Sequence, residues 1–219
     1  MSAKCLYTLL ARKILVTDIK IPETRIKFKD VFSLKNLYQM MHEMLLEEGW
    51  FAEEGAPGNP ASAHRFIETM YLENFYQKGL HSGGKELWIY WRLFKKAERR
   101  FSGYFRYKLN IDWHGVYLQD REIVHQGKKI KVQHGELELF FNATLQTDYN
   151  KGWETHWLLK HIKEIYEKRI IAQDIEKLEK RLWQEVYKVN GIVKKFLDLR
   201  VFVPTPEPLY PKLFGMSGE

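Results

Sequence analysis

The chain has 219 residues, 45% of them hydrophobic and 29% charged, which is the composition of a globular protein large enough to bury its own core. Its one cysteine, Cys5, excludes an internal disulfide and any metal site built from several cysteines. The net charge of +7 is concentrated in residues 61–115, with 10 basic and 5 acidic residues; this excess suits an anionic partner, although solubility alone also accounts for it.

The N-terminal residues do not have the layout of a signal peptide, because their short apolar run is interrupted by Arg12 and Lys13. No stretch of the chain approaches the roughly 18 uncharged apolar residues that a membrane-spanning helix needs. We therefore expect a cytoplasmic protein with no transmembrane segment. Residues 4–28 are predicted to be extended, with a turn or a sheet edge near Pro22.

The first predicted helix covers residues 34–48. Apolar side chains recur at spacings of three and four residues from Leu34 to Leu45, which places them on one stripe of a helix. Ser33 is a suitable N-cap because its hydroxyl can accept a hydrogen bond from a free backbone N–H. Gly49 is expected to end the helix.

The middle of the chain alternates between apolar and polar residues, and this period of two predicts consecutive antiparallel strands. In residues 104–114, for example, Phe105 and Trp113 fall on one face and Arg106 and Lys108 on the other. Tight turns are predicted at residues 126–127 and 134–135. The predicted strands are residues 66–77, 85–94, 104–114, 116–124, 129–132 and 136–145.

Residues from Trp153 onward are predicted to be helical, either as one helix bent near Ala172 or as a pair of helices. A first apolar stripe lies between Leu158 and Ile170, and a second, with heptad-like spacing, runs from Ile175 to Phe196. Packing of the second stripe on the sheet is one interpretation. A dimerising coiled coil is the alternative.

Residues 201–219 differ from the rest of the chain because four prolines exclude a helix and favour polyproline II. We therefore divide the chain into one α+β domain, residues 1–200, and a Pro-rich tail, residues 201–219. The apolar side chains of the tail are expected to contact the domain or a partner. They are Leu209, Tyr210, Leu213 and Phe214.

No motif for a nucleophile elbow, a phosphate loop, a dinucleotide site or a zinc protease is present. The histidines are scattered without the spacing of a metal site, so no metal and no cofactor is predicted. We expect a binding protein rather than an enzyme.

The best binding surface in the sequence is the polar face of the predicted sheet, where aromatic and basic side chains alternate. Such a surface can stack bases and contact phosphates. The alternative is that the C-terminal helix covers this face and makes its aromatic residues part of the core. The predicted binding residues are Trp88, Tyr90, Arg92, Arg99, Arg100, Arg106 and Lys108, with Lys95 and Lys96 as further phosphate contacts.

Two resemblances accompany these patterns. The order of strand, helix, antiparallel strands and long C-terminal helix resembles helix-grip proteins of the START and polyketide-cyclase type, which enclose an apolar ligand between sheet and helix. Residues 32–50, 83–92 and 127–149 are similar to small uncharacterised archaeal proteins, a resemblance that implies no activity and no site residues.

The sequence therefore predicts an α+β protein with an antiparallel meander of about six strands, one early helix and a long C-terminal helical region. A non-enzymatic protein that binds a protein partner or self-associates is the first hypothesis. Binding of nucleic acid or the ribosome, and binding of an apolar small molecule, are the alternatives. The small-molecule pocket would be lined by Trp91, Phe105, Leu109, Leu139 and Phe141.

Overall fold

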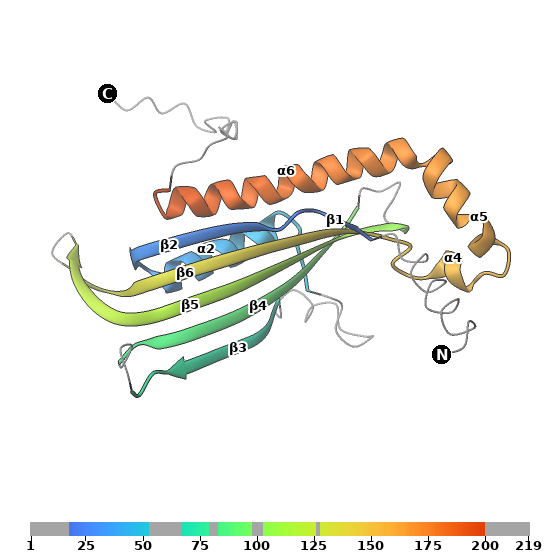
Figure 1. Cartoon of the computed structure of the whole chain (residues 1–219). Coiled ribbons are helices and arrows are strands. Elements are labelled where there is room, and N and C mark those ends of the chain that lie inside the picture. The colour runs from blue at the N-terminus through green and yellow to red at the C-terminus, as the bar shows by residue number, and fades with distance from the viewer. Residues whose placement is uncertain (1–17, 53–66, 79–82, 98–102, 126–127, 200–219) are drawn as a thin grey trace, which may run out of the picture.

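A computed structural model describes residues 18–52, 67–78, 83–97, 103–125 and 128–199 (Figure 1). The predicted α+β class is confirmed, since six antiparallel strands form one sheet and the long helices pack along it. The strands are β1 (Ile19–Lys20), β2 (Thr24–Phe32), β3 (Glu68–Phe75), β4 (Lys85–Lys96), β5 (Phe105–His125) and β6 (Lys128–Thr147).

The sheet is built around β6, which pairs with β5 on one side and with both β1 and β2 on the other. From β5 the order continues through β4 to β3, which forms the opposite edge of the sheet. The meander β3 to β6 follows chain order, as the alternating pattern predicts. The N-terminal strands join it out of order, with Thr24 opposite Phe141.

Strands β5 and β6 form a hairpin that is longer than the sequence predicts. The strands predicted at residues 104–114 and 116–124 are one strand, Phe105–His125, with a register shift between Val116 and Gln119. The turn predicted at residues 134–135 is wrong, because both residues lie within β6. The physical reason is that Gly135 does not form a turn but lets β5 approach closely, because it has no side chain. A Cβ atom at this position would lie 2.7 Å from the carbonyl oxygen of Tyr117, which belongs to the shifted segment. The turn predicted at residues 126–127 lies outside the described residues.

Helix α2 (Leu34–Glu47) confirms the first predicted helix. The Ser33 hydroxyl accepts a hydrogen bond from the backbone N–H of Asn36 at 3.4 Å, as expected of an N-cap. Gly49 follows the helix with φ of +82°, a conformation that glycine adopts at little cost. The buried side chains of α2 are Leu37, Met41 and Leu45, and they face the sheet core.

The C-terminal region contains α4 (Gly152–Thr155), α5 (Leu159–Ile165), a π-helical turn η1 (Tyr166–Ile170) and α6 (Ala172–Phe196). The interruption falls at Ile171, next to the bend expected at Ala172. The second apolar stripe is buried on α6 from Leu178 to Val193, so packing within the chain is the interpretation that the structure bears out, although Phe196 at the end of the stripe is 40% exposed. Among the described residues, no helix is both long and apolar enough to cross a membrane.

The hydrophobic core lies between one face of the sheet and helices α2 and α6. Its sheet side consists of the odd-numbered residues of β4 and β5, exemplified by Trp91 and Trp113, whose ring centroids lie 5.0 Å apart. Tyr38 from α2 packs edge-on against Trp91 at 4.9 Å. On β4, and on β5 before its register shift, the even-numbered residues are consequently turned to the other face of the sheet.

Candidate binding face of the sheet

We define the open face as the sheet face turned away from α2 and α6. The alternative that the C-terminal helix covers this face is wrong, because α6 buries Leu182 and Val186 on the opposite side. The side chains of the open face are partly exposed. On β4 and β5 they are Trp88, Tyr90, Arg92, Phe94, Lys96, Arg106, Lys108, Asn110, Asp112 and His114.

Strand register brings the predicted residues together. Trp88 is opposite His114, Phe94 is opposite Lys108, and Lys96 is opposite Arg106. Residues that face each other across an antiparallel pair have side chains on the same face, close enough to interact. The structure therefore places five of the predicted binding residues on one face of the sheet. They are Trp88, Tyr90, Arg92, Arg106 and Lys108.

The end of the open face near Phe94 is basic and aromatic. The Arg106 guanidinium lies 4.3 Å from the centroid of Phe94 and 4.9 Å from that of Tyr149, and it donates to Gln146 at 3.0 Å. The Lys108 ammonium lies 5.8 Å from the Phe94 centroid. Among the described residues, no carboxylate lies within ion-pair distance of Lys108. The aromatic rings therefore hold the two cations in place and leave Lys108 able to contact an anion.

The middle of the open face is balanced in charge. Arg92 donates to the Asp112 carboxylate at 2.5 Å and lies 5.1 Å from the centroid of Tyr90. This ion pair joins β4 to β5 across the face, and it leaves the Tyr90 ring next to a guanidinium that is already paired. We therefore expect Arg92 to position Tyr90 more than to contact an anion.

The other end of the open face carries carboxylates around His114. The Nε2 atom of His114 lies 3.1 Å from Glu86, and Trp88 stacks on its imidazole ring. Glu86 also accepts from the Trp88 indole at 3.0 Å and from the Tyr76 hydroxyl at 3.1 Å. The hydrogen bond from His114, with smaller help from Trp88 and Tyr76, lowers the pKa of Glu86 despite some desolvation.

Strands β2 and β6 extend the open face with residues that the sequence prediction missed. Arg25 from β2 lies 5.0 Å from the ring centroid of Phe140 and forms an ion pair with Glu138. Burial raises the pKa of Glu138, but hydrogen bonds from Arg25 and Lys27 outweigh it, so the net shift is downward. The sequence pattern could have assigned Phe140 to the open face, because Phe140 and Glu138 are two residues apart on an alternating strand.

Several predicted residues are not on this face or not among the described residues. Lys95 is on the core face, where its ammonium binds Glu185 of α6 at 2.7 Å and lies over the Trp50 ring. Its inclusion among the phosphate contacts is therefore wrong, and strand alternation is the reason. The predicted contacts at Arg99, Arg100, Leu209, Tyr210, Leu213 and Phe214 lie outside the described residues.

The residues predicted to line an apolar pocket are all in the hydrophobic core. Trp91, Phe105 and Leu109 are fully buried, as is Leu139, and Phe141 is nearly so. They pack in one continuous cluster with the apolar side chains of α2 and α6. Their burial is thus accounted for by contacts within the chain.

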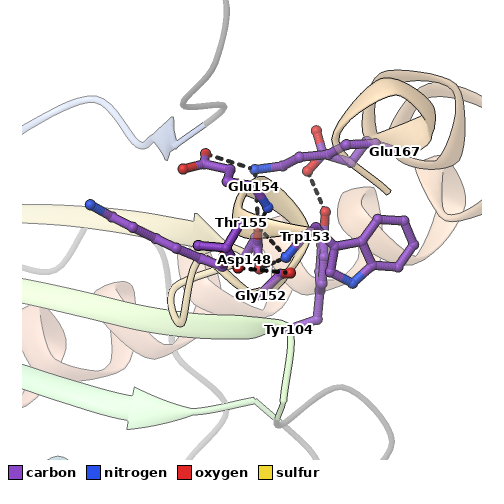
Figure 2. A network of polar contacts seen from close by, with 9 residues as sticks. Tyr104, Asp148, Gly152, Trp153, Glu154, Thr155 and Glu167 are labelled. Atoms are coloured by element: carbon purple, nitrogen blue, oxygen red, sulfur yellow. Dashed lines mark hydrogen bonds and ion pairs between the residues drawn. The ribbon is translucent and has the colours of Figure 1, made fainter. Parts of the chain in front are cut away.

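A second polar cluster joins the end of β6 to the C-terminal helices (Figure 2). Buried Asp148 accepts backbone N–H bonds from Trp153 and Glu154 at 3.1–3.2 Å, and buried Lys163 lies 3.5 Å from its carboxylate. The Tyr104 hydroxyl donates to Glu167 at 2.6 Å, and burial followed by this bond raises the pKa of Tyr104. These contacts fix the orientation of α4, α5 and η1 on the sheet.

Neither cluster has the composition of a metal centre. Within the described residues, no group of three or more His, Cys, Asp or Glu side chains is placed to hold a metal ion. Comparison with protein-family models, curated proteins and solved structures finds no match for this chain. The function therefore has to be argued from the open face itself.

Proposed function

We propose that this protein binds single-stranded nucleic acid on the open face of its sheet. The observation that carries the proposal is the cluster of Phe94, Tyr149, Arg106 and Lys108, in which two rings and two cations lie together on a face that α2 and α6 leave uncovered. Single strands are bound by just this combination, since bases stack on rings or on guanidinium planes while cations contact phosphates.

The two ends of the open face differ in charge, and this difference favours one orientation of a bound nucleic-acid strand. Carboxylates gather near His114, whereas Lys108 is without one among the described residues and lies beside Phe94. A polyanion should therefore contact the Phe94 end with its phosphates. Bases are better suited to the Trp88 end, where the stacked Trp88 and His114 rings give a flat surface.

The test is fluorescence anisotropy of a short labelled oligouridine with the full chain and with the Lys108→Ala variant. Binding should weaken as salt rises from about 50 to 200 mM, and the variant should lower the slope of log affinity against log salt by about 0.7, the value for one phosphate contact. Lys180→Ala is the matched control, because Lys180 is an exposed cation on α6. Absence of binding at the lowest salt, or equal effects of the two variants, would reject the proposal.

A second candidate function, self-association, is supported by β3. Within the described residues β3 pairs only with β4, and it exposes Met70, Tyr71, Leu72 and Phe75. An unpaired apolar edge strand is suited to pairing with another strand. If two copies of β3 paired antiparallel about Tyr71, Met70 of each copy would face Leu72 of the other.

Light scattering tests this candidate. A dimer that becomes monomeric in Leu72→Lys would support pairing through β3, because a charge at the centre of the edge opposes it. A chain ending at Arg200 distinguishes this from association through the Pro-rich tail. A monomer for the unchanged protein rejects both routes.

A further inference from the structure

The helical segment formed by α5 and η1 is amphipathic, but its isoleucines face solvent and two of its charged side chains face the protein. Its isoleucines Ile162, Ile165 and Ile170 are exposed, Ile165 at 57% and Ile170 at 66%. Tyr166 instead packs inward against Tyr104 and Trp153. Trp157, just before α5, is 74% exposed. The exposed apolar stripe, as we call it, consists of Trp157, Leu158, Ile162, Ile165 and Ile170.

The inward side of the same segment is charged. Lys163 and Glu167 are buried, and they bind the Glu154 carboxylate at 3.2 Å and the Tyr104 hydroxyl at 2.6 Å respectively (Figure 2). These bonds determine which side of the segment faces the sheet. The outward direction of the exposed apolar stripe is thus fixed by the polar cluster, and the stripe is left for a partner to cover.

The charges beside the stripe indicate the chemistry of that partner. Four exposed cations, Lys151, Lys160, Lys168 and Arg169, accompany a single exposed carboxylate, Glu164, which is paired with Lys168. A second copy of this surface would oppose cation to cation. A partner that is both apolar and anionic complements it better.

The first strand of the sheet lies at the same end of the fold as α4. Strand β1 begins at Ile19, opposite Leu145, close to the end of β6 from which α4 follows. In sequence, residues 1–17 contain Lys4, Arg12 and Lys13 but no acidic residue.

We propose that α5 and η1 form a peripheral docking surface for an anionic lipid bilayer. The exposed apolar stripe enters the boundary between headgroups and acyl chains, where an exposed tryptophan beside isoleucines is well suited. The flanking lysines and Arg169 contact anionic headgroups. This surface is separate from the open face, and the inference does not depend on nucleic-acid binding.

The experiment is flotation of the full chain with phosphatidylcholine vesicles, with and without phosphatidylserine. The protein should float only with the anionic vesicles. Ile165→Asp should lower the bound fraction about tenfold, because it places a charge where the proposal has an apolar side chain enter the bilayer. Val124→Asp is the matched control, because Val124 is 71% exposed near the end of β5, away from the stripe. Circular dichroism checks that each variant is folded.

Four other outcomes would overturn the proposal, and each points to a different partner or binding site. No flotation with anionic vesicles excludes a lipid partner, and an equal loss in Val124→Asp excludes the stripe as its site. Light scattering that shows an oligomer dispersed by Ile165→Asp, without vesicle binding, assigns the stripe to a second copy. Loss on deletion of residues 1–16 but not in Ile165→Asp assigns lipid binding to the N-terminal residues. Lys108→Ala should leave flotation unchanged.

Discussion

The Trp88 indole lies nearly parallel to the His114 imidazole, with ring centroids 3.7 Å apart and planes inclined by 16°. Strand register explains the stack, because the two residues face each other across β4 and β5. Glu86 binds both rings through their ring nitrogens, as their common acceptor. The three side chains therefore act as one unit at the carboxylate end of the open face.

Replacing Glu86 should make the pH dependence of stability weaker. The pKa of Glu86 is lowered from its ordinary value of 4.5, so the folded state favours its charged form. The resulting stabilisation is complete above pH 4.5 and is lost as the pH falls through the lowered pKa. Glu86→Gln should therefore melt at a lower temperature than the unchanged protein at pH 7, and the difference should shrink below pH 4.5. A difference that is constant with pH would contradict this assignment.

Lys163→Met should destabilise the protein strongly. The substitution removes a buried cation, whose side chain is 6% exposed, from between Asp148 and Glu154. Leaving the buried Asp148 carboxylate without its cation costs about 3–5 kcal/mol. Unfolding in urea measures the change, with Lys168→Met as control because that side chain is 72% exposed. Equal stability of the two variants would show that the cluster is not needed to hold α5.

Gly135→Ala should be destabilising although it adds only a methyl group. The new Cβ atom would lie 2.7 Å and 3.0 Å from the carbonyl oxygens of Tyr117 and Val116, which are backbone atoms that cannot move aside. Crowding of this kind costs about 1–3 kcal/mol. Gly103→Ala is the control, since a Cβ atom there meets no atom within 4 Å. Thermal unfolding that separates the two variants supports the register shift in β5.

Leu182→Ala should show that α6 belongs to the core. Leu182 is fully buried between α6 and the sheet, and truncating such a side chain costs about 2–5 kcal/mol. Lys180→Ala, on the exposed side of the same helix, should change stability little. If Leu182→Ala were as stable as that control, the stripe of α6 would have to be free for a coiled coil.

Phe94→Ala should weaken nucleic-acid binding without unfolding the protein. The ring contacts both Arg106 and Lys108, so its loss removes a stacking surface and frees the two cations. One base–aromatic stack contributes about 1–3 kcal/mol, which corresponds to a change in affinity of roughly 5- to 150-fold. Tyr187→Ala, an exposed aromatic on α6, is the control in the same anisotropy measurement.

Alternation in the sequence predicted the two faces of β4 and β5 because each side chain's face follows from its parity alone. It therefore placed Trp88 with Arg92, and Arg106 with Lys108, on one surface. The same rule assigns Phe140 to the open face and Lys95 to the core face, where the structure places them. Alternation could not predict that Arg25 lies on the open face, because this position depends on the pairing of β2 with β6, which are far apart in the sequence.

Two features required the structure because local pattern does not determine them. Gly135 follows His134 in a context typical of a turn, but its lack of a side chain serves close packing against Tyr117. The apolar spacing from Leu158 to Ile170 predicted a helix with one apolar side. It did not indicate that buried Lys163 and Glu167 would turn that side outward.

The pairing of β2 with β6 has a consequence for synthesis on the ribosome. Thr24 is made about 120 residues before its partner Phe141, which is roughly 6–24 s at the usual rates of translation. During this interval β2 has no strand to pair with, whereas β3, β4 and β5 can pair as each follows the last. The nascent chain is thus expected to assemble its sheet from the middle of the sequence and to recruit its own beginning late. In that period the unpaired edge of β2 is open to pairing with other chains.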